Sequence, residues 1–143
     1  MIDQGTVQYY AGAWRAFGST SNGTVSKELL PGNYSFRMTH EFISLDKAQD
    51  ISTNNTVSYS TVSCTVRVRN SQNQPVDNAQ ASYYSGAWRQ IGATVNGEVT
   101  KELLPVNLTF RINYGGTQQD KEQNLATNSV VEFVVQYSAG SIR

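Results

Sequence analysis

Tyr9-Tyr10-Ala11-Gly12-Ala13-Trp14-Arg15 is repeated almost unchanged as Tyr83-Tyr84-Ser85-Gly86-Ala87-Trp88-Arg89. A second stretch, Lys27-Glu28-Leu29-Leu30-Pro31, returns as Lys101-Glu102-Leu103-Leu104-Pro105. The offset is 74 residues in both cases (83 − 9 and 101 − 27), and the copies align without a gap from Asp3 and Asp77 to Val57 and Val131. A constant period of this kind predicts one structural unit used in tandem. Such an array favours a role in length, spacing or adhesion over a single catalytic pocket.

Both copies show the alternation that is typical of β-strands. Phe36 and Met38 alternate with Ser35 and Arg37, and the equivalent stretch around Phe110 has the same period of two, which predicts strands with one buried face. Asn-Gly pairs at 22–23 and 96–97 predict tight turns. No stretch predicts a long amphipathic helix, and short strands at this spacing predict an all-β sandwich. Further strands are predicted at residues 6–10, 24–29, 47–51 and 63–70, around Val57 and Tyr59, and around Val131, Phe133 and Val135.

The two copies differ at their beginnings, and this difference defines the expected domains. The second copy is preceded by the predicted strand 63–70 and a polar turn that ends at Pro75, whereas no such strand precedes Asp3. We therefore expect two β-sandwich repeats with a period of 74 residues: residues 1–62 without an opening strand, and residues 63–143 with a tail strand. Each would be close to the lower size limit for an independent core.

The end of the chain predicts contacts between chains. Residues 137–143 occupy the place that residues 63–69 have before the second copy, so this tail is a candidate for the opening strand of a further unit. An open groove in the first unit and a spare strand at the end favour strand exchange through β-augmentation. The expected partners are further copies of the chain, in a strand-swapped dimer or a head-to-tail chain.

The stretch from Gln74 to Gly115 has the plan of a known class of module. A turn with Pro75 is followed by a strand, a Thr-x-x-Gly turn at 94–97, and a strand that ends in Leu104-Pro105. The first copy has Leu30-Pro31-Gly32-Asn33-Tyr34 at this last point. This plan resembles the carboxypeptidase-regulatory-like and Cna-B-type modules of bacterial surface and secreted proteins, over nearly the whole of each copy.

The resemblance implies immunoglobulin-like or prealbumin-like sandwiches in an extracellular array at the bacterial cell surface. It implies no catalysis. Some Cna-B-type modules carry a Lys–Asn isopeptide bond whose lysine sits on the first strand. That strand contains no lysine here, since residues 64–69 read Cys-Thr-Val-Arg-Val-Arg, so the bond is not expected.

The charge balance argues against several kinds of partner. The chain has 11 Lys and Arg against 11 Asp and Glu, so nothing favours nucleic acid or an anionic membrane. No apolar run reaches the ~18–20 residues of a membrane span, and we expect no membrane insertion and no signal peptide. Cys64 is the one cysteine, which excludes an intrachain disulfide and favours a small buried residue on a strand.

The residues that carry chemistry form no recognisable catalytic set. His40 is the single histidine, and one histidine by itself makes neither a metal site nor a triad. Asp46-Lys47 recurs in the second copy, but neighbours on a strand point to opposite faces. Asp3 and Asp77 lack the spacing of a calcium-binding loop. The sequence therefore predicts no enzyme activity, no metal and no cofactor.

The repeated aromatic cluster is the strongest candidate for ligand binding. Tyr9 and Tyr83 are expected to point inward, so Tyr10 and Tyr84 should point outward. Exposed aromatic rings beside arginine suit stacking on a sugar ring or on a flat protein surface. The alternative, favoured by the usual burial of large aromatics, is that the tryptophans close the end of the sandwich under the aliphatic stem of arginine. The candidate ligand-binding residues are Tyr10, Trp14, Arg15, Tyr84, Trp88 and Arg89.

A second candidate site is a contact between units or between chains. Residues 41–45, Glu-Phe-Ile-Ser-Leu, replace Gly-Gly-Thr-Gln-Gln at 115–119, so a hairpin tip is apolar in one copy only. An apolar tip predicts packing on a neighbouring unit or another chain. The candidate interface residues are Phe42, Ile43, Leu45, Val134, Val135 and Tyr137.

Together these features predict a non-catalytic extracellular structural module: a stalk, a filament or a self-assembling element of a surface array. It would work through strand pairing and contacts between units. The alternative is an adhesin module that binds a carbohydrate or a protein through the repeated Tyr/Trp/Arg patch.

Overall fold

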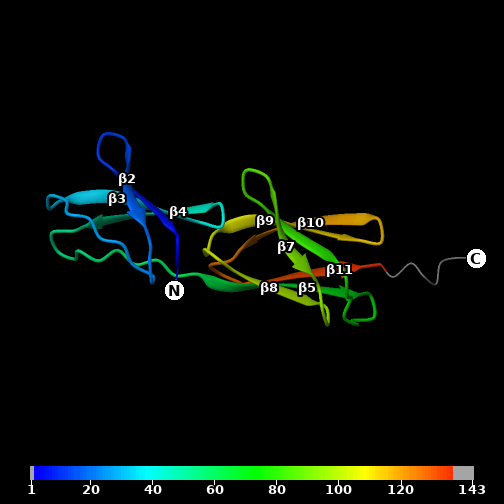
Figure 1. Ribbon diagram of the computed structural model, residues 1–143. Coiled ribbons are helices and arrows are strands. Elements are labelled where there is room, and N and C mark those ends of the chain that lie inside the picture. The colour runs from blue at the N-terminus through cyan, green and yellow to red at the C-terminus, as the bar shows by residue number, and fades with distance from the viewer. Residues whose placement is uncertain (1, 137–143) are drawn as a thin grey trace, which may run out of the picture. The chain divides into compact units, whose positions relative to one another are not determined.

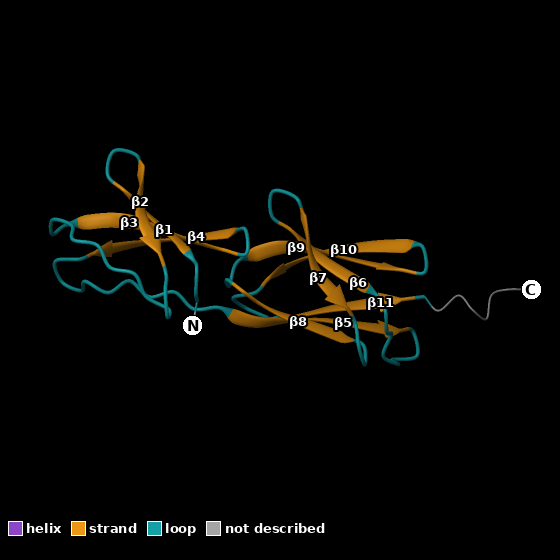
Figure 2. Cartoon of the chain, in the orientation of Figure 1, coloured by secondary structure: helices purple, strands orange, loops and turns teal. Residues whose placement is uncertain are grey.

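The computed structural model describes residues 2–136, and these residues form eleven β-strands and no helix (Figure 1, Figure 2). The all-β class predicted from the sequence is confirmed. The chain divides into two compact units, unit 1 (residues 1–61) and unit 2 (residues 62–143). Within the described range, no helix offers the length and apolar character needed to cross a membrane.

Unit 2 is a β-sandwich of two sheets (Figure 2). One sheet has four strands in the order β10-β9-β6-β7, and the other has three strands in the order β11-β5-β8. Strand β5 is central in the smaller sheet, since it pairs with β8 in antiparallel and with β11 in parallel orientation. The bounds are β5 Val62–Asn70, β6 Gln80–Tyr84, β7 Trp88–Ala93, β8 Glu98–Leu103, β9 Asn107–Tyr114, β10 Thr117–Asn124 and β11 Val130–Val135.

The core of unit 2 lies between its two sheets. Alternate residues of β5, namely Cys64, Val66 and Val68, are completely buried, as a strand with one face in a core requires. Phe110 and Ile112 of β9 present the buried face of the larger sheet. The remaining strand residues of this core are Ala81, Tyr83, Leu103, Leu108, Val131, Phe133 and Val135.

Unit 1 repeats only the larger sheet. Its strands are β1 Thr6–Tyr10, β2 Trp14–Ser19, β3 Asn33–His40 and β4 Ile43–Asp50, in the order β2-β1-β3-β4. This order matches β7-β6-β9-β10 of unit 2, and even the register shift after Val7 recurs after Ala81. The segments 25–30 and 54–61 have no strand structure.

The predicted strands at 24–29 and around Val57 and Tyr59 are therefore wrong. Their equivalents in unit 2, 74 residues later, are β8 and β11, and both of these pair with β5. No strand equivalent to β5 exists among the described residues of unit 1. Because a strand needs a hydrogen-bonding neighbour, the two segments stay extended but irregular.

The missing sheet leaves apolar side chains of unit 1 uncovered. Leu30 is 80% exposed, whereas its equivalent Leu104 is 0% exposed. Val57 is half-buried, whereas its equivalent Val131 is fully buried. In both pairs the two residues are identical, and the residue of unit 2, which has a second sheet, is the more deeply buried.

Both units anchor their entry loops through a buried threonine. In unit 2, the Thr94 hydroxyl donates to the carbonyl oxygen of Val76 (2.7 Å) and accepts from the amide of Ala79 (3.1 Å). In unit 1, Thr20 Oγ1 accepts from the amide of Gly5 (2.9 Å). Buried polar backbone groups are costly without a partner, so this hydroxyl is a structural requirement of each unit.

Replacing Thr94 by Val should lower the free energy of unfolding of unit 2 by about 1–3 kcal/mol, because a buried carbonyl and a buried amide lose their partner. Thr100→Val is the matched control, since Thr100 is exposed on β8, and should change stability by less than about 0.5 kcal/mol. Urea denaturation measures both. Equal stabilities of the two variants would contradict the structural role of the Thr94 hydroxyl.

Candidate functional site

A groove with a volume of about 760 Å³ runs over the inner face of the unit 1 sheet. Its floor includes Val7 of β1 and the buried Phe36 and Met38 of β3. Val25 and Val57 line it from the two irregular segments. The floor is apolar and the borders are backbone, which is the environment of a strand position inside a sandwich.

The repeat shows which element belongs in this groove. At an offset of 74, the two borders, 24–29 and 56–61, are equivalent to β8 and β11 of unit 2. In unit 2 the position between those strands is filled by β5, whose Val66 pairs with Val99 on one side and Val131 on the other. The groove of unit 1 therefore lies at the position that corresponds to β5 of unit 2.

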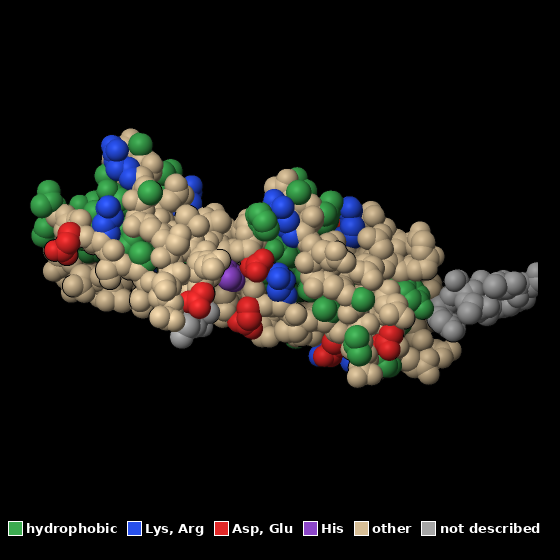
Figure 3. All heavy atoms as spheres, viewed as in Figure 1, with side chains coloured by type: hydrophobic (Ala, Val, Ile, Leu, Met, Phe, Trp, Pro, Cys, Tyr) green, Lys and Arg blue, Asp and Glu red, His purple; other side chains and the backbone are tan. Residues whose placement is uncertain are grey.

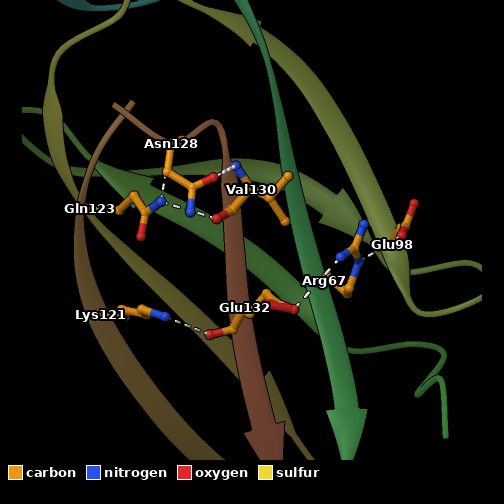
Figure 4. Close-up of polar contacts among 7 residues, drawn as sticks. All are labelled: Arg67, Glu98, Lys121, Gln123, Asn128, Val130 and Glu132. Carbon is orange, nitrogen blue, oxygen red and sulfur yellow. Dashed lines mark hydrogen bonds and ion pairs between the residues drawn. The ribbon is translucent and has the colours of Figure 1, made fainter. Parts of the chain in front are cut away.

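Side chains of the neighbouring strand hold one border of each unit in place. In unit 2, Lys121 Nζ donates to the Glu132 carbonyl oxygen (3.1 Å), and Gln123 Nε2 donates to the carbonyl oxygens of Asn128 (2.8 Å) and Val130 (3.0 Å) (Figure 4). Side chains of β10 thus hydrogen-bond to the backbone of β11 and of the residues just before it, in addition to the pairing of β11 with β5.

Unit 1 retains the same contacts without a strand. Lys47 Nζ of β4 donates to the Ser58 carbonyl oxygen, and Gln49 Nε2 donates to the carbonyl oxygens of Asn54 (2.7 Å) and Thr56 (2.7 Å). The border 54–59 is thus positioned by side chains of β4, although it forms no strand.

Tyr59 connects this border to β3 and β4. Its hydroxyl donates to the Phe36 carbonyl oxygen (2.9 Å), and Lys47 Nζ lies 5.1 Å from its ring centroid. Burial, with a smaller effect of the negative Asp46, raises the pKa of Tyr59 to about 12. The phenol therefore stays protonated and remains a hydrogen-bond donor at neutral pH.

The outer face of each larger sheet carries a repeated row of four side chains, the Tyr–Trp–Arg–Asp row. In unit 2, Tyr84 and Trp88 meet edge to face at 5.3 Å, and Arg111 Cζ lies 3.7 Å from the Trp88 ring centroid. The guanidinium also makes a bidentate contact with Asp120, from Nε (2.8 Å) and Nη2 (3.0 Å). Cation–π stacking and the ion pair together fix one geometry across the sheet.

Unit 1 has the same row. Tyr10 and Trp14 are 5.4 Å apart, and Arg37 Cζ lies 4.1 Å from the Trp14 ring centroid. Arg37 binds Asp46 through Nε (2.7 Å) and Nη2 (2.9 Å). The row is independent of the second sheet, since it is complete in both units.

The structure corrects the expected arrangement of the aromatic cluster. The tryptophans do not close the end of the sandwich, because Trp14 and Trp88 pair across strands with the outward Tyr10 and Tyr84. Tyr10 and Tyr84 are about half exposed, at 47% and 48%, as expected for the outer face.

The arginine that covers each tryptophan was also misidentified. Arg15 Nε donates to the Ala11 carbonyl oxygen (2.9 Å), and Arg89 Nε donates to that of Ser85 (3.1 Å). Both pair with the inward Tyr9 or Tyr83 across the hairpin. They support the loop, whereas Arg37 and Arg111 stack on the tryptophans. The signal was available, because Arg37 and Asp46 also recur at the offset of 74.

A small pocket of about 270 Å³ adjoins the row in unit 2. Trp88 forms one wall, and the other polar lining residues include Gln80, Gln90 and Asn113. Gln90 Nε2 donates to Gln80 Oε1 (3.0 Å), so the amides are oriented relative to one another. The equivalent positions of unit 1 are Thr6, Ala16 and Thr39, which carry no amide.

The expected interface residues are distributed differently. Ile43 and Leu45 belong to β4, not to a hairpin tip, and pair with His40 and Met38; Ile43 is buried and Leu45 half-buried. Phe42 alone is exposed, at a turn where Glu41 and Phe42 have positive φ values (52° and 66°).

Two other expected interface residues, Val134 and Val135, are neighbours on β11 and point to opposite faces of the sheet. Val135 is buried in the core of unit 2 and so does not face a partner, whereas Val134 is exposed. Tyr137 lies outside the described residues.

Other polar residues that were considered for chemistry have structural contacts. The carboxylate of Asp3 accepts from the Gly23 amide (2.8 Å), and that of Asp77 accepts from the Gly97 amide (2.9 Å), so both hold the Asn-Gly turns. Within the described range, no group of three or more His, Cys, Asp or Glu side chains is arranged to hold a metal ion. Cys64 is buried, and burial raises its pKa to about 11, which keeps the thiol protonated.

The face of the molecule shown in Figure 3 is poor in charge. In the face shown in Figure 3, backbone and uncharged polar side chains predominate, and charged side chains are scattered among them. A binding surface on such a protein would depend on strand edges, aromatic rings and amides, since no broad electrostatic patch is seen on this face.

No protein-family model and no curated protein gives a significant match to the sequence. The similarity to carboxypeptidase-regulatory-like and Cna-B-type modules therefore stays a prediction based on turn and core positions.

The arginine–aspartate pairs of the row make a prediction about pH. Hydrogen bonds and charge from Arg111 hold the pKa of the Asp120 carboxyl below its ordinary value, and Arg37 does the same for Asp46. A carboxyl with a lowered folded-state pKa contributes stability above its unfolded pKa and loses it as pH falls through the folded value. Stability should therefore fall in the acid range below about pH 4.

Arg111→Gln should move the pKa of Asp120 back towards its ordinary value and leave the pKa of Asp46, in the other unit, unchanged. Carboxyl-carbon NMR titration of both aspartates measures this. A low pKa of Asp120 that persists in the Arg111→Gln protein would show that the arginine is not its cause.

Proposed function

We propose that this chain is a non-catalytic structural repeat module whose unit 1 accepts a β-strand from outside its own four-stranded sheet. The observation that carries the proposal is the groove over Val7, Phe36 and Met38, at the place where unit 2 holds its central strand β5. An acceptor groove of this kind makes the module a building element of a stalk, filament or surface array.

Two contributions would stabilise a strand in the groove. A strand between the two borders would provide hydrogen-bonding partners to backbone groups that form ladders in unit 2 and would cover the apolar floor. Each fully buried Val- or Leu-sized side chain contributes about 1.5–3 kcal/mol. Association from separate molecules costs about 4–15 kcal/mol, so burial of a few side chains does not offset this cost by itself, and a strand from another molecule would also depend on the backbone ladder to both borders and would bind reversibly.

The setting of the proposal comes from composition and from the resemblance. A neutral, Ser-, Thr- and Asn-rich β-protein without a catalytic set is typical of extracellular structural modules, and the resemblance to bacterial surface modules agrees with a location outside the cell. Both are features of the sequence and support the proposal independently of the groove.

A graft tests the acceptor role directly. Ile2 is equivalent to Val76, so residues 62–75 of unit 2 can be placed immediately before Ile2 with their native turn. The grafted chain should pair with both borders, and backbone amides of 24–29 and 56–61 should become protected from hydrogen exchange by at least about tenfold. The reason is that both segments acquire a ladder partner.

The matched control is the same graft with Val66 and Val68 of the added copy replaced by Asp, which cannot enter an apolar core. It should leave both segments as unprotected as in the original chain. If the unaltered graft adds no protection, unit 1 is not a strand acceptor.

A second candidate function is the binding of a neutral sugar on the outer face of unit 2. It is favoured by the pocket beside Trp88, whose amides can both donate and accept hydrogen bonds from hydroxyl groups. Aromatic rings beside such amides suit the apolar face of a pyranose. The Tyr–Trp–Arg–Asp row by itself does not favour this function, because its arginine is already engaged with Asp120.

On an array of neutral glycans, Trp88→Ala should reduce binding at least about tenfold if this pocket is used, which corresponds to the loss of about 1.4 kcal/mol. Trp14→Ala is the matched control, since unit 1 has the same row without the three amide side chains, and it should bind as the original chain does. Similar binding by all three proteins would exclude the pocket.

A further inference from the structure

We infer that the strand that fills the groove of unit 1 is the segment 136–143 of a second copy of this chain, so that copies join head to tail. The inference rests on the proposed acceptor role and specifies its partner. Residues 137–143 lie outside the described part of the structure, and only their sequence is used.

Connectivity within the chain provides the template. Residues 56–61 form the last segment of unit 1, and the chain then continues directly into β5, which completes the sandwich of the following unit. The equivalent of 56–61 in unit 2 is β11, which ends at Val135, and the chain then continues into 136–143. At the offset of 74, these residues match 62–69 and cover all but the last position of β5. They stand in the position of a completing strand for a following unit.

Charge at one outward position distinguishes the tail from β5 itself. In unit 2, Arg67 of β5 binds Glu98 of β8 (2.8 Å) and Glu132 of β11 (3.6 Å), one on each side (Figure 4). The equivalents of the two glutamates in unit 1 are Thr24 and Ser58. An arginine in the unit 1 groove would thus lack both ion pairs.

The tail has an uncharged residue at this position. Ser141 is the equivalent of Arg67, and it would lie between Thr24 and Ser58. Hydroxyl groups on three neighbouring strands can hydrogen-bond to one another across a sheet. In unit 2, the positive Arg67 lies between two negative glutamates. In unit 1, the neutral Ser141 would lie between two neutral residues, so the tail and the borders match in charge.

Side-chain size on the inner face shows a second match. Val7 replaces Ala81 on the floor of unit 1, and Tyr59 replaces Phe133 at its border, so unit 1 has larger side chains there than unit 2. A strand that fits must be smaller, because a packed interior tolerates little extra volume.

The tail is much smaller than β5 at the middle inward position and larger by one methylene group at the next. Gly140 is the equivalent of Val66 and Ser138 of Cys64, and Ile142 is the one large apolar side chain, in the place of Val68. The larger floor and the smaller strand compensate each other. One apolar anchor also predicts weak, concentration-dependent association.

A donor at one end and an acceptor at the other make a heterologous contact. Such a contact does not close on itself unless the rotation happens to form a ring, so it leads to open chains of copies. The elongated assembly is a direct consequence of the same repeat that built the two units.

The test uses two altered chains, one without a free acceptor groove and one without the tail. The graft of residues 62–75 before Ile2 fills the acceptor and leaves the tail available, and a chain that ends at Gln136 keeps the acceptor and lacks the donor. By sedimentation velocity, each alone should stay monomeric, their mixture should form a 1:1 dimer, and the original chain should form longer species as its concentration rises.

A charge exchange tests the register. Ser141→Arg should weaken association of the original chain at least about tenfold, and adding Thr24→Glu and Ser58→Glu to the same chain should restore it by recreating the contacts of Arg67. Thr24 and Ser58 are exposed, so these changes leave the fold of unit 1 intact. Failure of the two glutamates to restore association would overturn the proposed register.

The outcomes distinguish the inference from the proposal on which it rests. If the graft protects 24–29 and 56–61 but the chain ending at Gln136 associates as well as the original, unit 1 accepts a strand and the tail is not its donor. If the original chain shows this protection at every concentration as a monomer, and loses it on truncation, its own tail fills the groove and the second copy is excluded. If the graft adds no protection, both fail.

Discussion

The pairing of β5 with a neighbour on each side is the interaction on which the smaller sheet depends. A three-stranded sheet has a single central strand, and its two outer strands have no other ladder partner. In unit 2, this strand contributes Cys64, Val66 and Val68 to the core, all completely buried. In unit 1, where no equivalent is present among the described residues, the same two flanking segments lose their strand conformation together. The second sheet therefore forms cooperatively around β5 or not at all.

The larger sheet behaves in the opposite way. Its four strands, its bulge and its outer row of Tyr, Trp, Arg and Asp are complete in both units. Consecutive hairpins supply most of its pairing, and the row ties its outer strands together with a cation–π contact and a bidentate ion pair. A sheet built in this way does not require the opposite layer to fix its register, although it leaves its apolar face uncovered without it. Unit 1 thus has a complete larger sheet whose inner face lines a groove.

Much of this fold follows from residue patterns, and the exceptions have a common cause. Alternation at Phe36 and Met38, or at Val66 and Val68, predicts strands and their buried faces from the segment itself. The segments 25–30 and 54–61 have the composition of strands, but whether they form strands depends on a partner that is not adjacent in the sequence. The stacking of Arg37 on Trp14 was missed for a similar reason, because it joins β2 to β3 across the intervening β1. The equivalence of 24–29 and 56–61 to β8 and β11 could be read from the repeat, since the two copies align at a constant offset of 74.

The irregular borders of unit 1 have a consequence for unwanted aggregation. A long, flat, regular strand edge is a template that almost any extended peptide can join, and it is the usual starting point of amyloid-type stacking. The border 54–59, which Lys47 and Gln49 hold in an irregular conformation, and the irregular segment 25–30 present no such continuous ladder. Only a strand that reaches both borders at once, in the correct alignment, can order them. If unit 1 accepts a strand as proposed, irregular borders would favour a specific partner over random association.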